Sequence, residues 1–127
     1  MEYMLCSAKT AARSYRDLVV WKKSMALVLD VYRSTQNFPW TEAYALVSQL
    51  RRAAVSIPSN IAKGQSRLST GEFRQFLGNA RGSFMEVETQ TLLAFGLGYL
   101  ESAEARLLGK ALRKSVYSLL QLKLERF

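Results

Sequence analysis

The sequence predicts an all-α protein whose four helices form an antiparallel, up-down bundle. Four segments carry apolar residues at spacings of three and four, which is the period of an amphipathic helix. Short breaks that contain proline or glycine separate these segments, and no strand-period repeat occurs. Helices joined by short connections most simply pack as an up-down bundle. We expect one bundle domain over residues 17–127, preceded by a tail over residues 1–16.

The first predicted helix runs from Asp17, a suitable N-cap, to about Gln36. Two apolar stripes lie side by side on it and leave only a narrow polar face. One stripe contains Leu18, Trp21, Met25, Val28 and Tyr32, and the other contains Val20, Leu27 and Val31. A helix that is apolar over so much of its circumference needs several neighbours. We therefore expect a subunit interface that includes Trp21, Val20, Leu27 and Val31.

The second predicted helix extends from about Glu42 to Lys63, and Gly64 closes it at the C′ position. A proline in a helix interior removes a backbone donor and costs roughly 3 kcal/mol. The apolar pattern nevertheless continues through Pro58, which indicates one kinked helix rather than two short ones. The Ala54 carbonyl loses its amide partner, and a nearby serine, water or another chain can replace it. We expect Pro58 to belong to the subunit interface.

A capping box precedes the third predicted helix, because Ser69 is followed three positions later by Glu72. The helix spans about residues 70–97. Gly78 and Gly82 lie one turn apart inside it, and each glycine costs about 1 kcal/mol relative to alanine. Two glycines on one face predict the close approach of another helix backbone.

The fourth predicted helix starts at Ser102 and continues to the C-terminus. A basic cluster lies on one of its faces, away from the core stripe, and consists of Arg106, Lys110, Arg113 and Lys114. Tyr117 follows Arg113 by one turn and can stack a base, so this cluster is a candidate nucleic-acid interface. The alternative is a solvated face whose cations suit the helix dipole.

The composition narrows the possible functions. The chain of 127 residues carries a net charge of +8, which favours an anionic partner or simply keeps the protein in solution. It contains no histidine and one cysteine, which excludes a Ser-His-Asp triad, a His-ligated metal and an internal disulfide. No phosphate-binding loop occurs, so we expect no enzyme, cofactor or metal. No apolar run is long enough for a membrane span or a signal peptide, which predicts a cytoplasmic protein.

Arg51 and Arg52 are the sharpest candidates for a binding role. Arg52 also shares a polar stripe of the second helix with Ser56, Asn60 and Lys63. Guanidinium, hydroxyl, amide and ammonium groups in a row can hold a phosphate backbone. The alternative is structural: Glu86 and Glu88 of the third helix can pair with the arginines, while Ser56 and Asn60 satisfy the backbone freed by Pro58.

Several motifs along the chain resemble the bacterial four helix bundle protein family, also called the 23S rRNA intervening-sequence protein family. The resemblance is carried by Asp17-Leu18, Val20 to Lys23, Ser48 to Ala62, Glu72-Phe73, Phe76-Leu77, Gly82-Ser83, Glu86, Glu88 and Leu97 to Tyr99. It covers the chain from about Tyr15 to the C-terminus. It implies an antiparallel bundle that assembles as a homopentamer. The chain departs from the family pattern at Lys63, where the family usually has glutamate.

The same resemblance extends to accessory proteins of diversity-generating retroelements, which bind nucleic acid and a reverse transcriptase. It makes Arg51 and Arg52 candidates for contact with nucleic acid or a partner protein. The sequence therefore predicts a non-enzymatic homo-oligomer that binds RNA or DNA through a basic surface. The alternative is an interaction scaffold for an acidic protein partner such as a reverse transcriptase.

Overall fold

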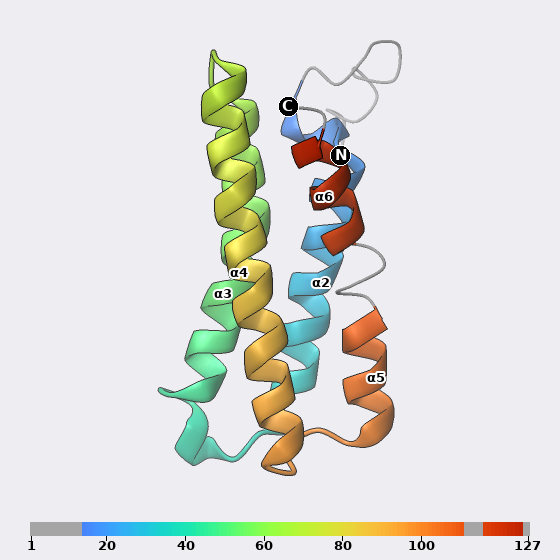
Figure 1. The fold of residues 1–127 in the computed structure, drawn as a ribbon. Helices are drawn as coiled ribbons and strands as arrows, with labels where there is room; N and C mark the ends of the chain where they lie inside the picture. Colours follow the sequence, from blue (N-terminus) through green and yellow to red (C-terminus); the bar gives the residue numbers. More distant parts are fainter. Residues whose placement is uncertain (1–13, 111–115, 126–127) are drawn as a thin grey trace.

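A computed structural model describes residues 14–110 and 116–125 of the chain. The described residues are helical, with no strand among them, and the predicted all-α class is confirmed (Figure 1). The elements are η1 (Tyr15–Asp17), α2 (Val19–Thr35), η2 (Trp40–Glu42), α3 (Leu46–Gln65), α4 (Thr70–Gly96), α5 (Ser102–Lys110) and α6 (Ser118–Glu125). No helix in these residues is long and apolar enough to span a membrane.

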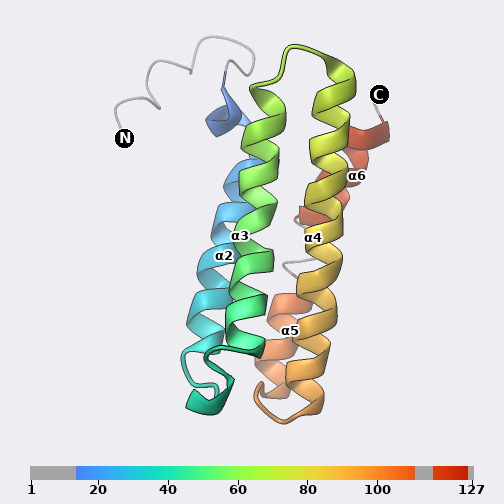
Figure 2. The same cartoon turned by 90° about the vertical axis from the view of Figure 1, so that its left-hand side faces the viewer.

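The helices surround one apolar core. α3 packs against α2 on one side and, most extensively, against α4 on the other. α5 contacts both α2 and α4, and α6 also packs on α4, so α5 and α6 complete the bundle opposite α3 (Figures 1 and 2). The largest fully buried side chains are Phe84, Leu27, Leu50, Ile57, Ile61, Leu77 and Leu120.

Three predicted subunit-interface residues lie in this core instead. Val20, Leu27 and Val31 are only 2%, 1% and 0% exposed within the single chain. That prediction is wrong, because α3 and α5 both pack on α2 and cover its second apolar stripe without help from another subunit.

The first two helices begin later than predicted. The residue before α2 is Leu18, and Asp17 belongs to η1. A separate 3-10 turn, η2, occupies residues 40–42, and α3 starts only at Leu46. Of the predicted tail, residues 1–13 lie outside the described residues. Tyr15 at its end packs edge-on against Trp21 of α2, with ring centroids 5.1 Å apart.

The glycines behave differently from the prediction. Gly64 lies inside α3 rather than closing it, since the helix continues to Gln65. A Cβ at Gly64 would lie 2.8 Å from Phe73 Cδ1 and 2.9 Å from Phe76 Cβ, so this glycine permits α3 to approach α4. At Gly78 and Gly82 a Cβ would meet nothing within 4 Å in the described part of the chain. Among residues 14–110 and 116–125, the predicted close approach at this pair is therefore wrong.

The start of the third helix agrees with the sequence. Ser69 Oγ accepts a hydrogen bond of 3.1 Å from the Glu72 amide, which is the first of the two hydrogen bonds of a capping box. The helix ends at Gly96, and Gly98 follows in the left-handed conformation with φ of 80°. A glycine suits this turn because it has no Cβ.

The two connections at the same end of the bundle contact each other. The Tyr99 ring of one connection lies 5.4 Å from the Phe38 ring of the other. Desolvation and then the negative charge of Glu42 raise the pKa of Tyr99. The fourth predicted helix is described as α5 and α6, and residues 111–115 between them lie outside the described residues.

Candidate nucleic-acid interface

Arg51 is bound to its own fold. Its Nε donates a hydrogen bond of 2.9 Å to Thr35 Oγ1, and its Nη2 donates one of 3.3 Å to the Tyr32 carbonyl. Its guanidinium also lies 4.4 Å from the centroid of the Tyr32 ring. These groups belong to the last turn of α2, where backbone carbonyls lack helical partners and carry partial negative charge. Arg51 therefore ties α3 to the C-terminal end of α2.

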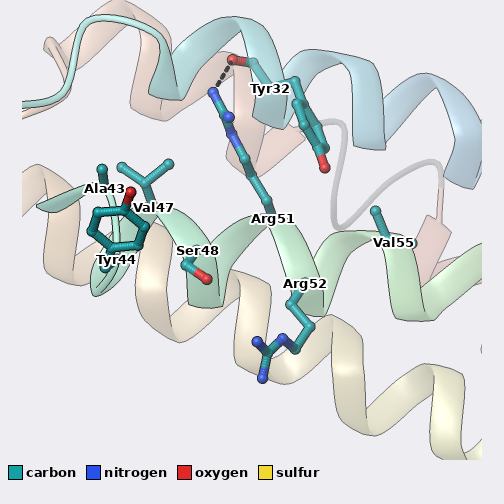
Figure 3. Close-up of a pocket in the computed structure, with 8 residues that line it drawn as sticks. All are labelled: Tyr32, Ala43, Tyr44, Val47, Ser48, Arg51, Arg52 and Val55. Atoms are coloured by element: carbon teal, nitrogen blue, oxygen red, sulfur yellow. Dashed lines mark hydrogen bonds between the residues drawn. The ribbon is translucent and has the colours of Figure 1, made fainter. Parts of the chain in front are cut away.

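Arg52 is exposed and extends in the opposite direction from Arg51 (Figure 3). One helical residue turns the side chain by about 100°, so two consecutive arginines cannot both face α2. Among the described residues, no ion pair joins Arg52 to Glu86, Glu88 or any other acidic residue. Its charge is available to a ligand.

Asn60 faces α4 rather than solvent. Its amide Nδ2 donates hydrogen bonds of 2.8 Å to the Ser56 carbonyl and 2.9 Å to Ser56 Oγ. Ser56 Oγ in turn shares a hydrogen bond of 2.8 Å with Ser83 Oγ of α4. Both side chains therefore have partners within the fold, but the expectation that they satisfy the carbonyl freed by Pro58 is wrong, because Asn60 binds the Ser56 carbonyl and not that of Ala54.

The predicted polar stripe therefore divides in two. Ser56 and Asn60 belong to the contact with α4, whereas Arg52 and Lys63 remain on the outer face of α3. A different row accompanies these two cations, with Tyr44, Ser48 and Ser59 at spacings of four and seven. We call Tyr44, Ser48, Arg52, Ser59 and Lys63 the outer row. The spacings of four and seven between Ser48, Arg52, Ser59 and Lys63 are a signal in the sequence that could have found the part of this row on α3. Tyr44 precedes the helix, so helical spacing does not place it.

A groove of about 500 Å³ opens where the outer row meets the end of α2 (Figure 3). Tyr32 of α2, Tyr44, Ser48 and both arginines are among its lining residues. Among the described residues that line it, the charged ones are Arg51 and Arg52, and both are cationic, which favours an anionic ligand. We call this groove the arginine groove.

A second groove, of about 300 Å³, continues along the seam between α2 and α3. Val55 lines both grooves and joins them. The second groove is mainly apolar, and its lining consists of Tyr15, Trp21, Met25, Val28, Val55, Pro58, Ser59 and Ala62. Two predicted interface residues, Trp21 and Pro58, are thereby brought together. We call it the apolar groove.

The basic cluster of the fourth predicted helix is only partly described. Arg106 and Lys110 are exposed on α5, whereas Arg113 and Lys114 lie outside the described residues. Tyr117 packs against Phe84 with ring centroids 5.1 Å apart, so the expectation that it stacks a base is wrong. α3 and α5 lie on opposite sides of the α2–α4 pair, so one chain cannot present both basic groups on one face.

The side-chain chemistry of the described residues contains no metal-binding cluster, since no three His, Cys, Asp or Glu side chains come together there. The features that remain are exposed cations, hydroxyls and aromatic rings on an outer helix face. Exposed cations can bind phosphate groups through charge-assisted hydrogen bonds, and an exposed aromatic ring can stack on a base.

Comparison with known proteins gives the family. The family model for the 23S rRNA-intervening sequence protein matches residues 16–120. The chain belongs to the 23S rRNA-intervening sequence protein family. The match includes the whole of helices α2 to α5, and therefore both arginines of α3 and the two described cations of α5.

A solved structure shows the same fold as this 23S rRNA-intervening sequence family member. It is a protein of unknown function from the S23 ribosomal protein family of Bacteroides thetaiotaomicron. The two share 19% sequence identity with a TM-score of 0.72, over 83% of this chain and 98% of the other. No curated protein matches the chain.

Proposed function

We propose that this protein is a non-enzymatic, homo-oligomeric bundle that binds RNA or DNA through the outer face of α3. The observation that supports the proposal is Arg52, an exposed guanidinium beside a groove whose other charged residue is also an arginine. A guanidinium binds phosphate through paired N–H donors, and Lys63 extends the basic face along the same helix. The net charge of +8 favours the approach of a polyanion.

Assembly is the second part of the proposal. α5 and α6 act as the fourth helix of an up-down bundle, and five such bundles form a ring. The apolar groove supports this assembly, since Trp21 and Pro58 both line it and an apolar seam of this kind favours burial against another chain. A pentamer multiplies the charge of +8 fivefold and presents five copies of α3 and α5, which one chain holds on opposite sides.

The test is fluorescence anisotropy of labelled RNA and DNA across a salt series, with the wild-type protein, Arg52→Ala and Arg33→Ala. Arg33 is a matched control because it is an exposed arginine that pairs with Asp30 at 3.4 Å on α2. We expect affinity to fall steeply with salt, and Arg52→Ala to weaken binding more than Arg33→Ala. Affinity that does not change between low and moderate salt would contradict the proposal.

A second candidate is an accessory protein for an acidic protein partner. It is favoured by the continuity of the apolar groove with the arginine groove, because an apolar seam beside a cation can hold an acidic protein surface. Recovery of one acidic protein from the native host after nuclease treatment, lost in Arg52→Glu, would favour this candidate. Recovery that nuclease abolishes would favour nucleic acid.

A further inference from the structure

The outer row suggests which form of nucleic acid this surface recognises. We propose that the arginine groove binds an unpaired nucleotide of a single strand, with the base stacked on Tyr44 and the phosphate held by Arg52. This inference rests on the proposed function and deepens it, because a basic surface alone does not distinguish a single strand from a duplex.

Tyr44 is the first observation. Its side chain is 99% exposed, although aromatic rings usually bury 150–250 Å². It lies in the connection between η2 and α3, directly before the helix, and it lines the arginine groove (Figure 3). No other described aromatic ring packs against it. An uncovered ring at the edge of a groove is a platform on which a flat ligand can stack.

The position of the cations is the second observation. Ser48 and Arg52 lie four residues apart in α3, so a hydroxyl and a guanidinium lie on successive turns of one helix face, and both residues line the groove together with Tyr44. Lys63 continues this face about 16 Å further along the helix axis, as eleven residues at about 1.5 Å each require. An aromatic ring followed by a row of cations matches the way proteins bind single strands, with bases stacked and phosphates tracked.

Arg51 explains why the groove keeps its shape. Arg51 covers one side of the Tyr32 ring and holds it through hydrogen bonds to α2. Tyr32 and Arg51 thus form a fixed wall, while Tyr44 and Arg52 keep their polar and aromatic surfaces open. A duplex cannot use this arrangement, because its bases are stacked and paired with one another and only an unpaired base offers its face to a side chain.

The experiment compares a labelled 12-nucleotide single strand of RNA with a duplex of equal length and with free mononucleotides, by anisotropy and competition. The full-length protein is tested as wild type, Tyr44→Ala, Tyr44→Phe and Arg52→Ala. The matched control is Trp40→Ala, because Trp40 is also exposed, at 86%, and belongs to the same connection but does not line the groove. Light scattering of each variant checks that assembly is unchanged.

We expect Tyr44→Ala to lower single-strand affinity by roughly fivefold to hundredfold and to change duplex affinity by less than about twofold. Tyr44→Phe retains binding, since stacking needs the ring and not the hydroxyl. Arg52→Ala lowers affinity for both forms and reduces the salt slope for the single strand by about 0.7. Mononucleotides compete weakly, because they engage only one of the cations.

Two results would overturn the inference while leaving the proposed function intact. One is equal affinity for duplex and single strand with no effect of Tyr44→Ala. The other is an equal loss in Trp40→Ala and Tyr44→Ala, which would show that the groove has no special role. A wild-type protein that binds neither form would instead contradict the proposed function itself.

Discussion

Gly64 shows how a single residue sets the distance between two helices. The absence of a Cβ lets the backbone of α3 meet Phe73 and Phe76 of α4. The same residue type at Gly78 and Gly82 of α4 has open space around it. The three glycines therefore differ in what they contribute, although each one is an unfavourable residue inside a helix.

We predict that Gly64→Ala destabilises the protein, whereas Gly82→Ala does not. The new Cβ at Gly64 would lie 2.8 Å from a phenylalanine ring, and relieving this overlap costs about 1–3 kcal/mol, more than the gain in helix propensity of about 1 kcal/mol. Gly82→Ala should stabilise the chain by up to about 1 kcal/mol. Urea unfolding measures both. A loss of stability in Gly82→Ala would show that another chain covers this face.

Two buried threonines form a natural pair for a second prediction. Thr35 and Thr91 are 3% and 4% exposed. Thr35 Oγ1 donates to the Val31 carbonyl at 2.8 Å and accepts from Arg51, whereas Thr91 Oγ1 has no hydrogen-bond partner in the structure described for the chain. A buried hydroxyl without a partner keeps its desolvation cost with no compensation.

We predict that Thr91→Val stabilises the protein by about 1 kcal/mol, because the substitution removes the unsatisfied hydroxyl and keeps the shape. Thr35→Val should destabilise it by about 1–2 kcal/mol, since the same change breaks two satisfied hydrogen bonds. Thermal unfolding of the two variants gives the comparison. Equal effects in the two variants would refute this account.

At the scale of elements, the contact between α2 and α3 depends on Arg51. The arginine joins the last turn of α2 through two hydrogen bonds and a cation–π contact. The sequence also allowed Arg51 to pair with Glu86 or Glu88 of α4. Its side chain instead turns toward α2, so it does not point at these carboxylates (Figure 3). Its part in the predicted binding site is thus to position Tyr32 rather than to offer its own charge.

We predict that Arg51→Met lowers the free energy of unfolding by about 1–3 kcal/mol, since methionine keeps the apolar stem but loses the polar contacts. Arg52→Met should change it by less than about 0.5 kcal/mol, because Arg52 is exposed. Chemical unfolding monitored by circular dichroism distinguishes the two neighbours. A larger loss in Arg52→Met would mean that Arg52 supports the fold.

At the scale of the whole molecule, the bundle buries one stripe of α2 and leaves another at the surface. Val20, Leu27 and Val31 complete the core of the single chain, whereas Trp21, Met25 and other members of the first stripe line the apolar groove. The broad apolar circumference of α2 therefore has two explanations: one stripe completes the core of the chain, and the other lines the apolar groove at its surface.

We predict that Met25→Lys reduces the mass of the assembly measured by multi-angle light scattering, because it places a charge in the apolar groove. Leu29→Lys is the control, since Leu29 is exposed on the same helix but does not line this groove. A wild-type mass of one chain would remove the pentamer from the proposal. An unchanged mass in Met25→Lys would place the subunit contact elsewhere.

Sequence alone determined the features that depend on local spacing and composition. The helical periods predicted the all-α fold, Ser69 and Glu72 marked the start of α4, and the surplus of Lys and Arg indicated a basic surface. These signals are local, because a cap or an apolar period acts within one or two turns.

Tertiary structure decided what each of two similar residues does. Arg51 and Arg52 are neighbours in sequence, yet one binds α2 and the other is exposed, because the side chains leave the helix about 100° apart and only the position of α2 selects between them. The same holds for Gly64 and Gly82, whose roles depend on whether another helix lies beside them. Tyr44 joined the candidate site only when the end of α2 was placed next to the start of α3.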